Sequence, residues 1–339
     1  MKSRLTVCLV SSLPLAIVAV ILFVKQILAR IRKCKCVRPD GPCTVVLTGA
    51  TGGIGQQLLV EFLRQDCNVI IGVRDMEKAK SMTNKIRSTL VPKCGTITIL
   101  WLDLSFLKSV KEFVNQIETL EDRIDILVNN AAVFHTTDQI KLSIDGFEEH
   151  FQVNYLAPML LCELLWPMMT FDDNGNDRTK HISSKIINIT SSLSSRMRRP
   201  FALADVNFAN SAYSPYAAYV RSKYALNLYT FDLYKRMYEK NIRVFSVHPG
   251  IVITPMHRRR SPNFFAFQLW RTLGFFLFNS PSQCARSIVH VCLSGHFNCL
   301  PEVMLKLDKP ESWPINLHQP EFTKELFDFS RLVCLLPPI

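Results

Sequence analysis

The amino-acid sequence predicts an α/β fold. A doubly wound parallel sheet of about seven strands forms a single domain, preceded by an N-terminal membrane-anchor helix. Two observations predict the sheet: short runs rich in Val and Ile recur along the chain, and an amphipathic helical pattern separates each run from the next. An uncharged stretch of twenty residues near the start of the chain predicts the anchor. The expected parts are the anchor and basic segment at 1–40, the globular domain at 41–309, and a C-terminal extension at 310–339.

The first forty residues predict a retained membrane anchor. Leu5 to Val24 carries no charge, and at about 1.5 Å per residue a helix of this length crosses a hydrocarbon core of roughly 30 Å. Two positive residues precede this stretch and six follow it, which favours a cytosolic position for everything after residue 25. An interfacial or hairpin anchor is the alternative, because Pro14 interrupts the segment. Cys34 and Cys36 are either acylation candidates or ordinary free thiols.

Strands and helices alternate in the domain that follows. The expected strands are 44–48, 68–73, 96–102, 124–130, 185–190 and 242–248, and the expected helices are 54–65, 75–90, 106–119, 153–170 and 215–239. Each strand is a short apolar run, and each connection is long enough for a helix. We therefore expect right-handed crossovers that cover both faces of a parallel sheet.

The last third of the domain contains an unusually apolar segment. Phe, Leu and Trp crowd residues 264–278 beside arginines at 258–260 and 271, which predicts a lid at 256–279 that covers an apolar site or touches an anionic membrane surface. A buried core helix is the alternative. The helical pattern at 321–336 has no predicted chemistry and is expected to pack on the sheet edge or on the membrane.

Charge and cysteine content exclude several classes of protein. The chain has 40 Lys and Arg against 28 Asp and Glu, but +7 of the net +12 lies in residues 1–40, so a nucleic-acid partner is not expected. The eleven cysteines are dispersed and contain no CxxC pair. This pattern predicts neither a metal site nor a disulfide scaffold, and it fits a reducing compartment.

The first strand leads directly into the glycine-rich turn TGATGGIG, from Thr48 to Gly55. Glycines let the backbone approach a pyrophosphate, and the N-terminus of the following helix offers unpaired N–H groups to the anion. A strand, this turn and a helix at the start of a domain predict the dinucleotide site of a Rossmann-like fold. A tight turn without a ligand is the alternative.

Four further segments follow the turn in a recognisable order. NNAA at 129–132, VNYLA around Asn154, YVRSK at 219–223 and HPGIVIT at 248–254, together with TGxxxGIG, resemble the short-chain dehydrogenase/reductase superfamily over about residues 44–293. Ala132 departs from the glycine that is usual in that family. The gap of 28 residues between Ser191 and Tyr219 is similar to its retinol dehydrogenase-like branch.

A narrower resemblance points to one kind of substrate. The segments DGFEEHF at 145–151 and AYSPYAAYVRSK at 212–223 resemble a member of this branch that acts on polyprenol and dolichol-type lipids.

The resemblance implies two sets of site residues and no metal ligand. The catalytic set is Asn154, Ser191, Tyr219 and Lys223, with a one-residue ambiguity among Thr190, Ser191 and Ser192. The cofactor-binding set is Thr48, Gly49, Thr51, Gly52, Gly53, Ile54, Gly55, Arg74, Asp103, Asn130, Ala131, Tyr219, Lys223, Pro249, Gly250 and Thr254.

The catalytic set fits proton and hydride chemistry. Tyr219 and Lys223 lie four residues apart on a predicted helix and so share one face. An adjacent ammonium group and an oxidised nicotinamide would lower the pKa of Tyr219, which could then act as general acid and base. By resemblance Ser191 would hydrogen-bond the substrate oxygen, Lys223 would also hold the nicotinamide ribose, and Asn154 would fix a water on the proton path. The alternatives are an exposed Tyr–Lys pair, a strand-end hydroxyl and a helix cap.

Cofactor preference depends on the end of the second strand. Arg74 suits the 2′-phosphate of NADP(H), which is favoured, whereas Asp75 could accept the ribose 2′-hydroxyl of NAD(H). Asp103 is implied to lie on the adenine side, or else it caps the helix that starts near Ser105.

These features imply a membrane-anchored oxidoreductase that interconverts a lipophilic alcohol and its aldehyde or ketone. A polyprenol or dolichol-type lipid is the favoured substrate, with a retinoid or a hydroxysteroid as alternatives. A nucleotide-sensing membrane scaffold without turnover is the alternative from another class. The expected location is the endoplasmic reticulum membrane with the domain in the cytosol, or a lipid droplet. The sequence leaves open the direction of the reaction and whether the chain forms a homo-oligomer.

Overall fold

The structure, a computed structural model, describes residues 41, 43–90, 94–170, 183–197, 199–250, 252, 279–300, 303–312, 314 and 318–336. The expected anchor within residues 1–40, the expected lid up to residue 278 and the expected cofactor residue Thr254 all lie outside the described residues. In the part of the chain that is described, no helix has both the length and the apolar character needed to cross a bilayer.

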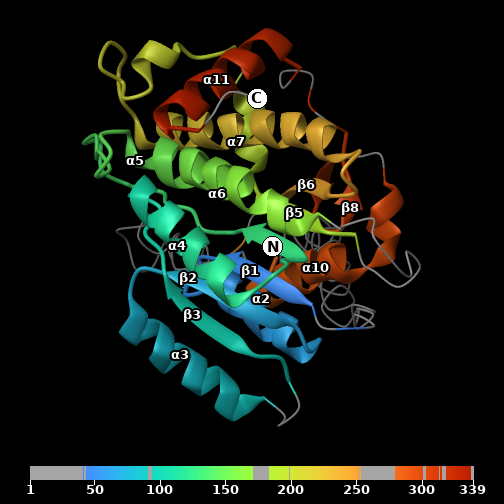
Figure 1. Cartoon of the computed structure of the whole chain (residues 1–339). Coiled ribbons are helices and arrows are strands. Elements are labelled where there is room, and N and C mark those ends of the chain that lie inside the picture. Colours follow the sequence, from blue (N-terminus) through green and yellow to red (C-terminus); the bar gives the residue numbers. More distant parts are fainter. Residues whose placement is uncertain are drawn as a thin grey trace, which may run out of the picture.

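One mixed sheet forms the centre of the domain (Figure 1). Its strands are β1 (Thr44–Thr48), β2 (Asn68–Val73), β3 (Ile97–Trp101), β4 (Ile126–Asn129), β5 (Lys185–Ile189), β6 (Arg243–His248), β7 (Met304–Lys306) and β8 (Lys309–Pro310). They are arranged in the order β3-β2-β1-β4-β5-β6-β7-β8, and all neighbours are parallel except β7 and β8. The strand order reverses between β1 and β4, and a crevice at the carboxyl ends of the strands is expected at such a reversal.

The central strands are buried on both faces. All residues of β1, β4 and β5 are buried, in agreement with their near-continuous Val, Ile and Leu content. Val45 pairs with Val69 on one side and with Ile126 on the other, which places β1 in the middle of the sheet. The glycine-rich turn that follows β1 therefore emerges at the reversal point.

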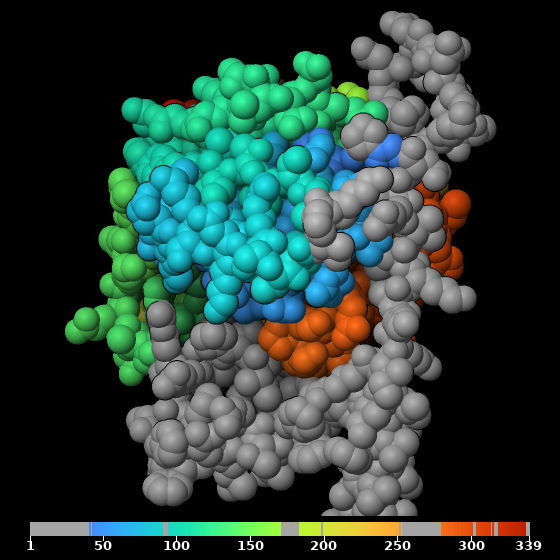
Figure 2. Space-filling model, turned by 90° about the horizontal axis from the view of Figure 1, so that it is seen from below, coloured from blue at the N-terminus to red at the C-terminus, as the bar shows by residue number. Residues whose placement is uncertain are grey.

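Two helical layers cover the sheet. The helices α4 (Leu107–Leu120), α6 (Ala157–Leu165) and α7 (Pro215–Met237) enclose one apolar core, and α2 (Gly53–Arg64), α3 (Met76–Thr89) and α10 (Pro281–Leu293) enclose the other. Seen from below, the orange surface of α10 adjoins the blue and cyan surface of the first third of the domain (Figure 2). Both faces of the sheet are thus covered, as the sequence predicts.

Local sequence signals explain where the main helices begin. The Ser214 hydroxyl accepts a hydrogen bond from the backbone N–H of Ala217 at 3.0 Å, and Pro215 follows at the first helical position of α7. Ser280 and Pro281 start α10 in the same way. These caps fix the start of α7, the helix that bears Tyr219 and Lys223.

The predicted helix 153–170 differs from the structure at both ends. A short helix α5 (Glu149–Phe151) precedes a π-helical segment at Gln152–Leu156, and after α6 the last turn is a 3₁₀ helix, Trp166–Met169. Pro158 has no N–H to donate to the carbonyl of Asn154, so a regular i to i−4 ladder cannot pass through this point. The helix widens there instead, and the N–H of Ala157 bonds the carbonyl of Gln152.

The C-terminal part differs from the expectation as well. The sheet has eight strands rather than about seven, because β7 and β8 extend it, and β8 lies across the expected boundary at 309 and 310. Helix α11 (Pro320–Val333) packs on α7 and not on the sheet edge (Figure 1). Its buried residues Phe322, Leu326 and Phe327 join the core beneath α7. Burial of this apolar stripe explains why the helix docks there.

Candidate active site

A cavity of about 760 Å³ opens at the carboxyl ends of the strands. Most of the predicted site residues line it: Thr48, Gly49, Thr51, Gly52, Gly53, Ile54, Arg74, Asp103, Asn130, Ala131, Ser191, Tyr219, Lys223, Pro249 and Gly250. Gly55 and Asn154 are not among the lining residues, and Thr254 lies outside the described residues. The cavity follows the crevice expected at the reversal of strand order.

The glycine turn has the geometry of a phosphate-binding loop. Gly49 has φ of +68°, and a Cβ there would lie 2.7 Å from the Cα of Ala131. The Asn130 side chain donates to the carbonyls of Thr48 and Gly49 at 3.0 and 3.2 Å and so holds the turn against β4. Because the N-cap of α2 is Gly52, which has no side-chain acceptor, the first N–H groups of the helix remain available to an anion.

Gly55→Ala tests this turn. A Cβ at Gly55 would lie 2.0 Å from the carbonyl oxygen of Gly49, so the turn must open. We expect a loss of about 1–3 kcal/mol in unfolding free energy and a clear weakening of dinucleotide binding, measured by denaturant unfolding and fluorescence titration. Gly295→Ala is the matched control, because no described atom lies within 4 Å of its added Cβ. Equal effects of the two substitutions would contradict the close approach inferred for Gly55.

The end of β2 presents two positive side chains to the cavity. Arg74 and Lys78 both line it. The carboxylate of Asp75 instead accepts the backbone N–H of Lys78 at 2.9 Å and caps α3. The capping role leaves Asp75 less suited to bind a ribose hydroxyl. Lys78 was not among the predicted site residues. Its position one turn after Arg74, at the start of the expected helix, is a sequence signal that could have identified it.

Asp103 also lines the cavity, but it does not cap α4. Its Oδ1 accepts from the backbone N–H and the hydroxyl of Ser105 at 2.9 and 2.8 Å. The N-terminus of α4 is capped from a distance in sequence, since Leu107 donates its N–H to Asp145 at 2.7 Å. Asp103 therefore shapes the loop after β3 at the cavity edge.

Ser191, Tyr219 and Lys223 come together beside the glycine turn. Ser191 follows β5, and Tyr219 and Lys223 lie one turn apart on α7. Lys223 is 2% exposed, and its Nζ donates to the carbonyl of Ile189 at 2.8 Å. Burial lowers the pKa of Lys223 to about 7. Its charge thus changes within the physiological range of pH.

Tyr219 differs from the expectation in its electrostatics. Burial raises the pKa of Tyr219, although a hydrogen bond with Ser191 lowers it in part. The polypeptide by itself therefore does not produce the predicted decrease. That decrease would have to come from a protonated Lys223 and the positive charge of an oxidised nicotinamide. The ring of Phe134 packs edge-on against Tyr219 with centroids 5.0 Å apart, which fixes the ring in the cavity wall.

Asn154 supports the cavity wall from behind. Its Oδ1 accepts from the N–H of Val133 at 2.8 Å, and its Nδ2 donates to the carbonyl of Val133 at 3.0 Å and to Ser222 at 3.1 Å. It lies inside the π-helical segment and not at a helix start, so the helix-cap alternative does not describe it. The Asn154 side chain thus connects the segment after β4 with Ser222 of α7, which is three residues from Tyr219.

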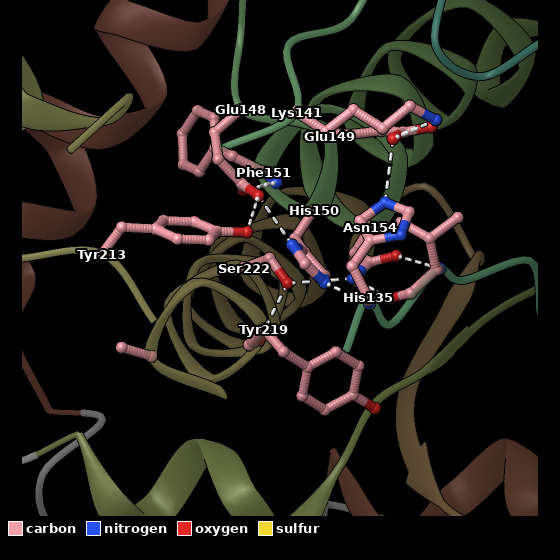
Figure 3. Close-up of polar contacts among 12 residues, drawn as sticks. His135, Lys141, Glu148, Glu149, His150, Phe151, Asn154, Tyr213, Tyr219 and Ser222 are labelled. Carbon is pink, nitrogen blue, oxygen red and sulfur yellow. Dashed lines mark hydrogen bonds and ion pairs between the residues drawn. The ribbon is translucent and has the colours of Figure 1, made fainter. Parts of the chain in front are cut away.

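A polar cluster behind Tyr219 was missed in the sequence (Figure 3). His150 is fully buried, and its Nδ1 lies 2.6 Å from Oε1 of Glu148. Its Nε2 accepts the backbone N–H of His135 at 2.9 Å. An acceptor role at Nε2 requires the neutral tautomer with the proton on Nδ1, shared with Glu148. This pair fixes the backbone of His135, which lines the cavity.

A second group of polar contacts lies in the same wall. Glu149 is buried, and its Oε2 lies 2.8 Å from Nε2 of His135 and 2.7 Å from Nζ of Lys141. Burial lowers the pKa of His135 despite the neighbouring carboxylate. All three residues line the cavity. The run of Glu148, Glu149 and His150 directly before an apolar helix is the sequence signal that could have identified both pairs.

The assembled groups can exchange a proton and bind a dinucleotide in one cavity. Comparisons with known proteins agree with this chemistry. A family profile described as short chain dehydrogenase matches residues 43–263. Retinol dehydrogenase 13 of Mus musculus is 36% identical over 258 residues, covering 74% of this chain and 71% of that protein. Polyprenol dehydrogenase of Homo sapiens is 30% identical over 265 residues, covering 76% of this chain and 74% of that protein.

Solved structures share the fold. The RhlG/NADP active-site complex of Pseudomonas aeruginosa superposes with a TM-score of 0.60 at 20% identity, covering 80% of this chain and 97% of that one. The shared fold alone does not establish the family, but the profile match and the two relatives do. This chain therefore belongs to the short chain dehydrogenase family, in its retinol dehydrogenase-like branch, and is an oxidoreductase that acts on CH–OH donors.

Proposed function

We propose that this oxidoreductase uses NADP(H) to interconvert a lipophilic alcohol and its aldehyde or ketone, with a polyprenol or dolichol-type lipid as the favoured substrate. The observation that carries the proposal is that Ser191, Tyr219 and Lys223 face the cavity that also contains the glycine turn. The relatives named polyprenol dehydrogenase and retinol dehydrogenase support a lipophilic substrate. Retinol or a hydroxysteroid remains the alternative substrate within the same reaction class.

The proposed roles follow from the positions of the side chains. Bound NADP(H) would accept or supply the hydride. Tyr219 takes the alcohol proton in oxidation and returns it in reduction, and Ser191 hydrogen-bonds the reacting oxygen. Lys223 lies one turn along α7 and contributes charge to Tyr219 and a donor to the cofactor ribose. Asn154 holds the wall residue Val133 in place, and the predicted water on the proton path remains a proposal.

Part of the cavity wall is suited to a hydrocarbon chain. Val133, Phe134 and Val153 line it beside Tyr219. Apolar side chains around a few convergent polar groups are typical of sites that orient a ligand by one end. A lipophilic alcohol would place its oxygen at Ser191 and Tyr219 and its chain along this wall.

Arg74 and Lys78 support a preference for NADP(H) over NAD(H). Both side chains are positive and line the cavity at the end of β2, where a 2′-phosphate is bound in folds of this type. Asp75 is bonded to α3 instead. NAD(H) remains the alternative cofactor.

Reversing the charge at these positions tests the cofactor preference. Arg74→Glu combined with Lys78→Glu should raise the KM for NADPH by about 10- to 100-fold, since a charge-assisted hydrogen bond contributes roughly 1.5–3 kcal/mol. The KM for NADH should change much less. Lys80→Glu is the matched control, because Lys80 lies on the same helix, pairs with Glu77 and does not line the cavity. An unchanged ratio of the two KM values would remove both residues from the cofactor site.

A substrate panel tests the proposed reaction. Purified full-length protein in detergent is assayed with NADPH and NADH against polyprenal, retinal and a ketosteroid. The proposal expects the highest kcat/KM with polyprenal and NADPH. Preferred turnover of retinal or of the ketosteroid would move the assignment to that substrate. Cofactor binding without turnover of any of the three would favour the nucleotide-sensing scaffold.

The proposed location rests on the sequence. The uncharged stretch Leu5 to Val24 and the basic residues after it support an anchor in the endoplasmic reticulum membrane or on a lipid droplet, with the domain in the cytosol.

A further inference from the structure

Three aliphatic side chains are exposed in the segment from residue 140 to residue 144. Ile140, Leu142 and Ile144 are 41%, 52% and 69% exposed. Between them, Lys141 turns back to Glu149, with Nζ 2.7 Å from Oε2, and Ser143 donates to Oε1 of Gln152 at 2.6 Å. Three exposed aliphatic side chains within five residues form a small apolar surface.

Backbone hydrogen bonds fix the position of this segment. The N–H of Ser143 bonds the carbonyl of Phe147 at 2.8 Å, and the N–H of Ile144 bonds the carbonyl of Ser105 at 3.2 Å. Gly146, with φ of +82°, closes the turn between them. These bonds hold the three aliphatic side chains at the surface.

The C-terminal end of α11 extends the exposed apolar surface. Leu332 and Leu335 are 73% and 81% exposed. Phe329, one turn before Leu332 in α11, packs edge-on against Phe147 with ring centroids 6.5 Å apart, which places this end of the helix beside the turn. We call Ile140, Leu142, Ile144, Leu332 and Leu335 the apolar rim.

The apolar rim adjoins the mouth of the active-site cavity. Lys141 belongs to the rim segment and lines the cavity together with its partner Glu149 and with His135 (Figure 3). The backbone bond between Ile144 and Ser105 also places the segment at the carboxyl edge of β3, the same edge as the cavity. A surface in contact with the rim would thus lie directly outside the cavity.

We propose that the apolar rim docks on a lipid surface, so that the cavity opens toward the membrane. Its five members are all Leu or Ile, and none is a Trp, Tyr or Arg of the kind that dominates protein–protein contacts. Lys111, near the start of α4 and beside the turn, supplies positive charge for anionic headgroups, whereas Lys108 pairs with Glu112 at 3.7 Å. The inference deepens the proposed function, because a lipophilic substrate would then enter from the bilayer without crossing water.

Photo-crosslinking tests the docking separately from catalysis. Full-length protein carrying p-benzoylphenylalanine in place of Leu142 is reconstituted in vesicles of phosphatidylcholine and phosphatidylserine and irradiated. The matched control places the probe at Leu120, which is 54% exposed and lies at the far end of α4, about 20 Å along the helix. The proposal expects abundant lipid adducts from position 142 and few from position 120. Equal lipid labelling, or adducts to a second copy of the chain in place of lipid, would overturn it.

A kinetic measurement links the rim to substrate entry. Leu142→Ser with Ile144→Ser should raise the KM for a long-chain alcohol dissolved in vesicles by about tenfold, because less apolar surface contacts the bilayer. The KM for a short water-soluble alcohol should stay the same, as should both values in Leu120→Ser. Equal changes for both alcohols would contradict the inference. Lipid adducts without turnover would uphold docking and refute the proposed reaction.

Discussion

Tyr219→Phe is expected to lower kcat/KM by about 10² to 10⁴-fold, the range that a positioned general acid or base contributes. The substitution removes the hydroxyl and keeps the ring, which packs edge-on against Phe134. Cofactor binding and the unfolding midpoint should therefore change little. Initial rates, fluorescence titration with NADPH and thermal unfolding measure the three quantities on the same preparation.

A nearby tyrosine provides the control for this prediction. Tyr216 lies three residues earlier on α7, and its buried hydroxyl has no hydrogen-bond partner among the described residues. Tyr216→Phe therefore removes the same atom from the same helix without touching the cavity, and turnover should stay within about twofold of the unmodified protein. If Tyr219→Phe also remained within this range, Tyr219 could not be the acid and base.

The order of the elements could be predicted from the sequence because each central strand is buried on both faces. The expected strand 44–48 is β1 residue for residue, and the expected strand 68–73 is β2. Continuous apolar runs of this kind leave few alternatives. The short strands β7 and β8 were missed because three and two residues are too few to carry a pattern, and the sheet edge forms them by pairing.

The glycine turn was easier to predict than the wall behind Tyr219. The glycine turn depends on backbone geometry that a short motif specifies, and most of its residues line the cavity. Glu148 and His150 are two residues apart, and their side chains meet because the chain turns there. The same His150 side chain also accepts the backbone N–H of His135. The run of Glu148, Glu149 and His150 marks the segment, but no periodicity shows which of these side chains meet. Burial raises the pKa of Tyr219, and the spacing of Tyr219 and Lys223 in the sequence could not predict this burial.

Lys223→Met is the second substitution with a large expected effect, and it should change activity and stability in opposite directions. Turnover should fall by about 10²-fold or more, since Tyr219 loses the charge that would favour its ionised form. Burial lowers the pKa of Lys223 from 10.5 to about 7, so folding at neutral or acidic pH keeps an unfavourable buried charge. Met removes that charge, and the folded variant should be more stable at pH 6.

The contribution of Lys223 to the free energy of unfolding depends on pH. Between pH 7 and 10.5 the unfolded chain binds a proton at Lys223 that the folded chain has released, so unfolding free energy rises with pH in this window. The contribution is at most about 1.4 kcal/mol per pH unit. The stability difference between the variant and the unmodified protein should therefore be largest below pH 7 and shrink toward pH 10. Urea unfolding at a series of pH values measures it.

Lys185 provides the matched control, because it is a second buried lysine that does not line the cavity. Its Nζ donates to the carbonyls of Val291 and Ser294, and burial lowers its pKa to about 8. Lys185→Met should alter the pH dependence of stability in the same direction as Lys223→Met but leave the turnover of the folded fraction intact. If the two variants lost turnover equally, the loss in Lys223→Met would reflect impaired folding and not a role of Lys223 in the reaction. If neither changed the pH dependence, the buried charge inferred at both sites would be wrong.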